Sequence, residues 1–162
     1  MDLISKYDNA AVRRQDRLLD AGRAIELLWQ REYGFLALGG EGGYGVPLNY
    51  AVAGHSIYFH CAPEGEKLRA LAQNNRVSFC VVGTTKVISN KFTTAYQSVL
   101  AKGTLHTGLS DEEKMHALEV ILDKYSPNEK VIGLKDAEKS FHRTEIMRLD
   151  IQSVSGKCKP MP

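Results

Sequence analysis

The segment over residues 44–67 restricts the fold more than any other part of the chain. Its apolar residues recur at every second position over 44–52 and again over 57–59, and a period of two is typical of β-strands. Gly54 lies between the two runs and permits a tight turn at little conformational cost. Pro63 ends the second run, so the segment predicts a β-hairpin followed by a helix. The alternating apolar positions are Tyr44, Val46, Leu48, Tyr50, Val52, Ile57 and Phe59.

The helix after the hairpin is expected over residues 66–74, with Gly65 before it and Lys67 in its first turn. A lysine there opposes the helix dipole, but it favours anion binding because unpaired N–H groups and an ammonium converge on one point. The alternative is a solvated lysine, and the carboxylates of Glu64 and Glu66 weaken the local positive field. The segment therefore predicts a sheet surface that ends in a candidate phosphate site.

The chain of 162 residues has the size of one domain and can bury a substantial core. We expect a single domain over residues 1–162, with residues 1–15 as an N-terminal arm. Apolar residues make up 43% and charged residues 25%, as in ordinary globular proteins. The formal charge of +2 gives no broad field for nucleic acid or anionic lipid, so neither is expected as a partner.

Three cysteines, Cys61, Cys80 and Cys158, form an odd set without CxxC spacing. This set argues against a disulfide framework or a zinc site and fits a reducing cytoplasm. The N-terminus lacks the apolar run of a signal peptide, and no segment approaches the roughly 20 apolar residues of a membrane span. We expect a cytoplasmic protein without a bound metal.

Three principal helices are predicted, and the third follows a capping box formed by Ser110 and Glu113. They span Asp20 to about Arg31, residues 66–74, and residues 111–125, with a short helix near 136–140. The predicted apolar stripes are Ala24, Ile25, Leu28 and Trp29 in the first helix, and Met115, Leu118, Leu122 and Tyr125 in the third.

Strands are expected at 33–38, 44–52, 56–61, 77–82, 93–106 and 144–151, with a connecting loop at 83–90. The run 77–82 is almost continuously apolar, which predicts a strand covered on both faces. Gly103 indicates a bulge or bend in the longest strand, and the inward register of the last strand is expected to shift once after Ile146. Because hairpins connect most strands, the pattern favours an antiparallel barrel with helices outside over a doubly wound sheet.

Gly40, Gly42 and Gly45 match the dinucleotide-binding pattern G-x-G-x-x-G. That motif must open a helix, so that the pyrophosphate lies at the helix N-terminus. Here a strand containing Pro47 follows, and we interpret the glycines as a hairpin turn.

Five segments in this order resemble the pyridoxamine 5′-phosphate oxidase-like flavin-binding split barrels, and among them most closely the 5-nitroimidazole resistance (Nim-type) proteins. The segments are 46–50, 57–67, 77–83, 92–99 and 155–157. The resemblance covers nearly the whole chain from about Val12. It implies a mainly β (α+β) fold, a six- or seven-stranded antiparallel split β-barrel with flanking helices. It also implies a homodimer with FMN, or alternatively FAD, at the interface.

The resemblance implies a role for each matching residue. Residues 47–49 would offer backbone groups to the flavin pyrimidine edge, and residues 59–62 would run alongside the cofactor. Lys67 would hold the phosphate, while Gln97 and Ser98 would supply polar contacts across the dimer. The implied cofactor-binding residues are Pro47, Leu48, Asn49, Tyr50, Phe59, His60, Cys61, Ala62, Lys67, Gln97 and Ser98, with Lys157 as a weaker candidate for a second phosphate contact.

His60 is the candidate catalytic residue, because it ends a strand beside the proposed ring and resembles the histidine of the Nim-type proteins. A histidine there could donate a proton to the substrate or orient it. The alternative is a structural histidine hydrogen-bonded at a strand end. Cys61 points to the opposite face, so a nucleophilic pair with His60 is not expected.

No Ser-His-Asp order or carboxylate pair stands out, so the chemistry would belong to the cofactor. The resemblance implies a flavin-dependent oxidoreductase that reduces small organic acceptors, with nitroaromatics such as 5-nitroimidazoles as the class its name suggests. Two alternatives stay open. The chain could be a flavin-binding redox sensor or carrier without turnover, or a pyridoxamine phosphate oxidase-like enzyme.

Overall fold

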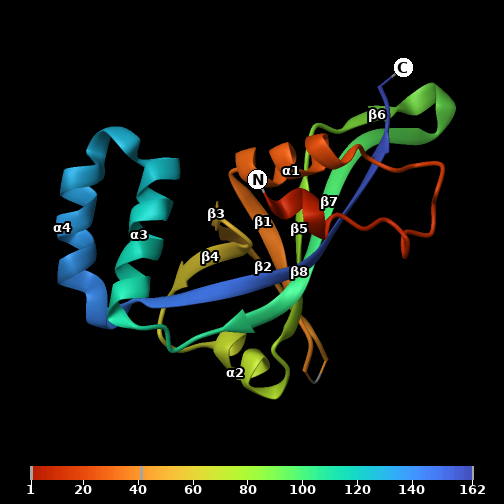
Figure 1. Ribbon diagram of the computed structural model, residues 1–162. Helices are drawn as coiled ribbons and strands as arrows, with labels where there is room; N and C mark the ends of the chain where they lie inside the picture. Colours follow the sequence, from red (N-terminus) through yellow and green to blue (C-terminus); the bar gives the residue numbers. More distant parts are fainter. Residues whose placement is uncertain (1, 41, 162) are drawn as a thin grey trace.

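The computed structural model describes residues 2–40 and 42–161, which form a curled antiparallel sheet with four α-helices around it (Figure 1). The helices are α1 (Ala21–Gln30), α2 (Glu66–Gln73), α3 (Asp111–Tyr125) and α4 (Lys130–Ser140). The strands are β1 (Tyr33–Leu38), β2 (Tyr44–Asn49), β3 (Ala51–Ala53), β4 (Ser56–Cys61), β5 (Arg76–Val82), β6 (Lys86–Ile88), β7 (Thr93–His106) and β8 (Glu145–Lys159). The predicted fold class, a mainly β antiparallel split barrel with flanking helices, is confirmed.

The main sheet has the order β2-β1-β5-β7-β8-β4-β3, and β6 pairs with β7 beside this path. The two longest strands, β7 and β8, cross the whole molecule (Figure 1). Their register shifts between Lys102 and Gly103, so that Gln152 of β8 is passed over. A Cβ atom on Gly103 would overlap the carbonyl oxygen of Asp150. The predicted irregularity at Gly103 is therefore confirmed, although the additional residue lies on the neighbouring strand.

The inner face of the sheet encloses the main core, and α1 packs into it. Tyr50, Phe59 and Phe79 are fully buried there, and the Phe79 ring contacts each of the other two edge to face. The ring centroids lie 4.7 Å apart for Tyr50 and Phe79, and 5.1 Å apart for Phe59 and Phe79. The side chain of Asp20 accepts a hydrogen bond from the backbone of Arg23, so the predicted cap of α1 is confirmed.

A second, smaller core lies where α3 packs on the other side of β3 and β4. Its members are Ala51, Tyr58, Ala117, Ile121 and Ile146. Ser110 accepts a hydrogen bond from the backbone N–H of Glu113, as the capping box predicts. The Glu113 carboxylate instead accepts bonds from the Tyr58 hydroxyl at 2.9 Å and from Arg148 at 2.8 Å. These contacts fasten the start of α3 to β4 and β8.

The helix predictions need correction at three points. Trp29 is 37% exposed, and Leu27 occupies a buried position in α1 instead. In α3 the buried residues are Ala117 and Ile121 rather than the predicted stripe. Leu122 of that stripe faces Gly133 of α4, which runs beside α3. The predicted short helix at 136–140 is the second half of the longer α4.

Five predictions about the strands also change. The predicted strand 44–52 is two strands, because Tyr50 bonds its backbone to α3 at the break. The predicted loop 83–90 contains β6, and the last strand continues to Lys159. The predicted single shift of inward register in the last strand falls at Gln152 rather than after Ile146. Ile146 faces the second core, while Met147 and Ile151 face the first on one side of Gln152 and Val154 on the other. The outer face of strand 77–82 is half open rather than covered.

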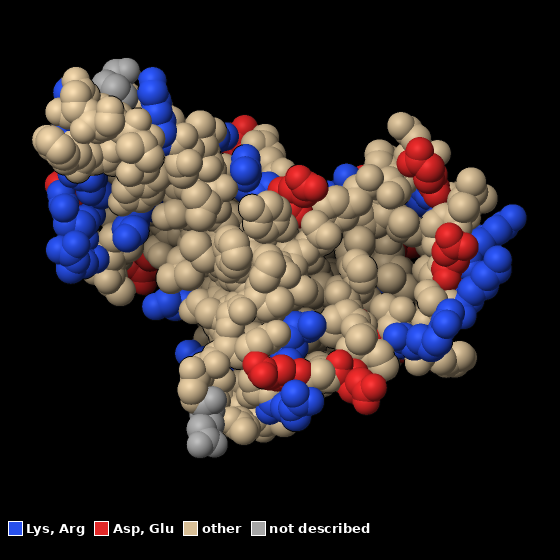
Figure 2. Space-filling view, turned by 180° about the vertical axis from the view of Figure 1, so that it is seen from behind, with Lys and Arg blue, Asp and Glu red and all other residues tan. Residues whose placement is uncertain are grey.

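The described part of the predicted N-terminal arm packs against the barrel. Leu3 is 1% exposed, and Tyr7 forms a parallel bridge with Val154 of β8. Residue 1 of this arm, residue 41 of the predicted hairpin turn and residue 162 lie outside the described residues. The side of the molecule in Figure 2 carries few charges across its centre, while basic residues gather at both the left and the right edge of the view. No helix of the described residues has the length and apolar character needed to cross a bilayer.

Candidate functional site

The sheet is open between β2 and the last half of β4. β2 is the first strand in the sheet order and is paired along its length with β1. β3 pairs with residues 56–58 of β4, while residues 59–61 are paired with β8 on the other side. β2 and β4 approach each other across this opening, which we name the β2/β4 split. Free strand edges present backbone donors and acceptors to whatever fills the space between them.

The predicted residues on β2 and β4 border this split. Pro47 and Asn49 are exposed on the outer side of β2, and Leu48 packs partly into the main core. Outside β1 and β2, a shallow depression of about 500 Å³ is lined by Tyr33, Phe35, Pro47, Leu48 and Asn49. The Asn49 amide donates to the carbonyl of Glu32 at 2.9 Å. An apolar surface beside a free strand edge suits a flat ring that needs backbone hydrogen bonds.

Two predicted aromatic residues belong to the barrel interior. The side chains of Tyr50 and Phe59 have no exposed surface. The Tyr50 backbone is also engaged, because its N–H donates to the Tyr125 hydroxyl at 2.9 Å and its carbonyl accepts from Lys124 at 2.9 Å. Tyr50 therefore holds the end of β2 in place, and Phe59 can reach the split with its backbone alone.

A second set of predicted residues gathers where β4 ends and α2 begins. His60 is exposed opposite Ile146 of β8, while Cys61 turns toward the main core. Ala62 is exposed in the connection to α2. Burial raises the pKa of the Cys61 thiol, and the nearby positive charge of Lys67 opposes this shift. The negative charge of Glu145 also raises the pKa of the Cys61 thiol, so the lysine, the thiol and this carboxylate lie close together.

The start of α2 has the features of an anion site and one feature against it. Gly65 adopts φ +136° before the helix, and no side chain caps the first turn. The first-turn N–H groups therefore lack a capping acceptor, and Lys67 adds a cation beside them. Glu66 lies in the same turn and reduces the local positive potential. Lys67 is thus near Cys61 and the end of the split, as the anion hypothesis requires.

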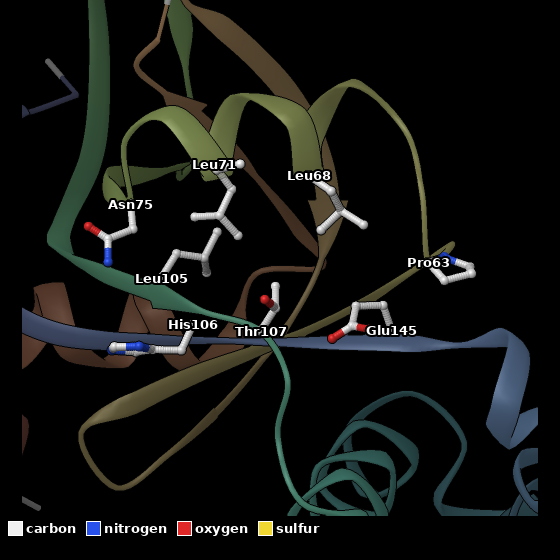
Figure 3. Close-up of a pocket in the computed structure, with 9 residues that line it drawn as sticks. Pro63, Leu68, Leu71, Asn75, Leu105, His106, Thr107 and Glu145 are labelled. Carbon is white, nitrogen blue, oxygen red and sulfur yellow. The ribbon is translucent and has the colours of Figure 1, made fainter.

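A cavity of about 500 Å³ lies between α2 and the adjoining ends of β7 and β8 (Figure 3). Leu68 and Leu71 of α2 form one side, and Leu105 of β7 closes the base. Glu145 and Thr107 lie opposite the two α2 leucines. Sequence analysis missed both polar residues, because each falls at the end of a strand or in a loop with no motif around it. Since Glu145 is paired with Cys61, the cavity adjoins the strand-end group.

His106, to which the sequence analysis assigned no role, also lines this cavity. Its Nε2 lies 3.2 Å from the Asp150 carboxylate. Asp150 also accepts bonds from Arg148 at 2.9 Å and from Ser56 at 3.0 Å. These groups link β4, β7 and β8 on the outer face. No group of three or more His, Cys, Asp or Glu side chains in the described residues is arranged to hold a metal ion.

Gln97 and Ser98 of β7 point to opposite faces, as consecutive strand residues do. The Gln97 side chain accepts a hydrogen bond from Arg23 of α1 at 3.2 Å. Ser98 lies on the outer face, opposite Val82 of β5 on one side and Lys157 of β8 on the other. Of this predicted pair, Ser98 therefore presents its side chain to the outer face, together with Lys157.

One chain does not bring the two predicted sets together. Cys61 is paired with Glu145 at the start of β8, and Ser98 is paired with Lys157 near its end. Twelve residues of strand separate these two pairings, which is a contour of roughly 40 Å at about 3.3 Å per residue. Lys67 and Ser98 therefore lie toward opposite ends of β8.

The outer face of the sheet also carries an apolar row. Pro47, Phe35, Cys80 and Leu100 lie next to one another across β2, β1, β5 and β7. Phe35 is 47% exposed, and Val82 is 40% exposed on the same face. An apolar row of this kind in a folded protein is typical of a surface that contacts another molecule.

The family model for pyridoxamine 5′-phosphate oxidase matches residues 20–158. A structure of a candidate 5-nitroimidazole antibiotic resistance protein from Bacteroides thetaiotaomicron matches with a TM-score of 0.70 at 22% identity, over 88% of this chain and 86% of that one. An FAD-binding protein from Mesorhizobium loti matches with a TM-score of 0.63 at 25% identity, over 89% and 98%. The flavocytochrome Anf3 from Azotobacter vinelandii gives 0.75 at 18% identity, over 97% and 76%. A search of curated proteins found no match.

Proposed function

Because the chain belongs to the pyridoxamine 5′-phosphate oxidase family, we propose that it binds a flavin in the β2/β4 split. The observation that carries the proposal is the pair of free strand edges at residues 47–49 and 59–61, which face each other beside an apolar depression. Flavin-binding proteins among the structural matches support the same cofactor class. The test is the visible spectrum of the purified protein, followed by identification of the released chromophore. A colourless protein that takes up neither FMN nor FAD would contradict the proposal.

The residues at the split fit the two ends of such a cofactor. Backbone groups of residues 47–49 would hold the polar edge of the ring, and the backbone of residues 59–62 would line its side. Lys67 and the first turn of α2 would hold a phosphate. When bound, the flavin would supply electron or hydride transfer, a chemistry that the chain's own side chains lack.

We propose FMN as the cofactor and the cytoplasm as the location. Lys67 and the uncapped first turn of α2 would form one phosphate-sized anion site beside the split, which suits a monophosphate. The three cysteines are free thiols, and thiols persist in a reducing compartment. FAD extraction from the purified protein would overturn the first assignment.

We propose that two copies form a homodimer with the outer faces of β1, β5 and β7 at the interface. The apolar row through Phe35 would then be covered, and Ser98 and Lys157 of one copy would approach the split of the other. Within one copy, the residues around Lys67 and those around Ser98 are separated by roughly 40 Å along β8, at about 3.3 Å per residue. In the dimer, the first set of one copy would meet the second set of the other. Light scattering that shows a flavin-loaded monomer at micromolar concentration would rule it out.

We propose that the flavin-loaded protein reduces a small organic acceptor, with nitroaromatics such as 5-nitroimidazoles as the first class to test. His60 is exposed at the end of β4, next to the split, and its ring has no competing role in the core. From this position it would donate a proton to the reduced acceptor or orient it. A positioned general acid contributes about 10²–10⁴-fold to a rate.

The test of His60 uses the His60→Ala variant fully loaded with flavin, reduced without oxygen and mixed with a nitroimidazole. We expect reoxidation to slow by about 10²–10⁴-fold while flavin affinity stays unchanged. His55→Ala is the matched control, because this exposed histidine lies in the turn between β3 and β4, at the opposite end of β4 from His60. Reoxidation at the wild-type rate on both sides of pH 6.5, about the ordinary histidine pKa, would leave His60 as a structural residue. A protein that binds flavin but reduces no acceptor would instead favour a redox carrier or sensor.

A further inference from the structure

A second cleft lies between α1, β3 and α3, apart from the split. Its volume is about 400 Å³, and apolar residues make up most of its surface. Trp29 of α1 forms one wall and Val120 of α3 another, while the three residues of β3 form the base. Trp29 keeps 37% of its surface exposed, which is unusual for the side chain with the largest apolar area. The cleft is large enough for a small aromatic molecule.

One cation lies in this apolar surface. Lys124 of α3 lines the cleft, and its Nζ lies 3.6 Å from the ring centroid of Tyr50. The ammonium donates to the carbonyl of Arg31 at 2.7 Å and to that of Tyr50 at 2.9 Å. An ammonium has three protons, and these bonds use two of them. The third proton has no oxygen or nitrogen acceptor among the described residues, and the Tyr50 ring lies against the same ammonium.

The charge of Lys124 is not balanced by a carboxylate. No ion pair of the described residues includes Lys124, and the adjacent Asp123 is paired with Lys130 at 2.9 Å. Burial lowers the pKa of Lys124 to about 8, while the two carbonyls and the ring favour its charged form. A half-buried ammonium without a counterion gains from a bound anion, because the pair offsets its desolvation.

We propose that this cleft is a second small-molecule site, which binds an aromatic carboxylic acid with the carboxylate on Lys124 and the ring against Trp29. The apolar walls select the ring, and the unbalanced ammonium selects the anion. A cationic ligand is disfavoured, because the carboxylate of Asp123 is already matched by Lys130. The proposal does not rest on the flavin assignment, since none of the cleft residues belongs to the proposed cofactor site.

Trp29 reports on this cleft directly, because it is the single tryptophan of the chain. The probes are 3-phenylpropionate and its uncharged amide, 3-phenylpropanamide, titrated into protein whose flavin content is matched between samples. We expect the acid to change the Trp29 fluorescence saturably. The amide should bind roughly 10- to 100-fold more weakly, as expected when a charge-assisted hydrogen bond is lost. Equal binding of acid and amide, or no saturable binding of the acid, would overturn the proposal.

Three variants complete the test. Lys124→Gln should lose roughly 10- to 100-fold in affinity for the acid but not for the amide. Lys139→Gln is the control, and its affinity should stay at the wild-type value because Lys139 is exposed on α4 and does not line the cleft. Ala53→Phe fills the cleft without removing the ammonium, so it should abolish binding of both probes even where Lys124→Gln fails to fold. Wild-type affinity of the acid for either Lys124→Gln or Ala53→Phe would refute the site.

Discussion

The two faces of β1, β5 and β7 carry similar side chains in different surroundings. On the inner face, Leu36, Phe79 and Ala101 lie side by side in register and are fully buried. One residue away on the outer face, Phe35 lies beside Cys80 and is 47% exposed. Both faces are apolar, but the chain covers one of them with its own residues. The almost continuous apolar pattern of such a strand therefore does not distinguish a face that the chain buries from one that it leaves half exposed.

The largest effect should come from the inner face. Phe79→Ala removes a ring that contacts both Tyr50 and Phe59 and leaves a cavity in the main core. We expect a loss of about 3–5 kcal/mol in the free energy of unfolding, measured by urea denaturation. Phe35→Ala is the matched control on the outer face and should cost less than about 1 kcal/mol in the monomer. Similar losses for the two variants would remove the distinction between the faces.

Residues on the outer face should affect dimer formation more than the stability of the fold. Phe35→Asp places a charge in the apolar row, and we expect the dimer to weaken by about 2–4 kcal/mol, as for a central interface residue. The measurement is the dissociation constant by analytical ultracentrifugation. An unchanged dimer would show that the row through Phe35 lies outside the interface.

Flavin affinity connects the outer face with the split. Lys67→Ala should weaken flavin binding by about 1.5–3 kcal/mol, the range for a hydrogen bond to a charged group, and Lys67→Arg should retain more. If the partner completes the site, Phe35→Asp should weaken flavin binding as well. Calorimetric titration with FMN measures both variants. Wild-type affinity of Lys67→Ala would remove Lys67 from the phosphate site.

The smallest predicted effect concerns the ion pair between Glu113 of α3 and Arg148 of β8, where α3 packs on the sheet. The hydrogen bond from Arg148 lowers the pKa of Glu113. A carboxyl group with a lowered pKa in the folded state stabilises the fold at neutral pH, and this contribution is lost as the pH falls through the folded-state value. Since both partners are partly exposed, we expect less than about 1 kcal/mol. Thermal unfolding between pH 7 and pH 3 should show a shallower acid slope for Glu113→Gln. An unchanged slope would mean that this pair does not fasten α3.

Local patterns in the sequence predict most of the fold. The period of two marks the strands, and Asp20, Ser110 and Gly103 mark two helix caps and a bend, because each signal arises from neighbouring residues. The errors occur where distant segments decide the outcome. Trp29 and the stripe of α3 depend on which neighbour each helix meets, and the ends of β8 depend on pairing with β7.

The candidate site was predictable in part for the same reason. Lys67 and residues 47–49 are close in sequence, so a local pattern could indicate both, although the predicted hairpin is limited to β3 and β4 and β2 pairs with β1 instead. Glu145 and Thr107 enter the neighbouring cavity from segments distant in sequence, and no local signal marks them. The opposite directions of Gln97 and Ser98 follow from strand geometry alone, but their distance from Lys67 follows from the length of β8.

The free edges of β2 and β4 would also affect the solubility of the protein before a cofactor binds. An unpaired strand edge can pair with an edge of another molecule, and this is a common beginning of aggregation. A ligand that occupies the opening removes that template and stabilises the native state by mass action. In cells or expression cultures that are short of flavin, more of this protein would then aggregate. Its soluble yield would therefore depend on the supply of the vitamin from which flavins are made.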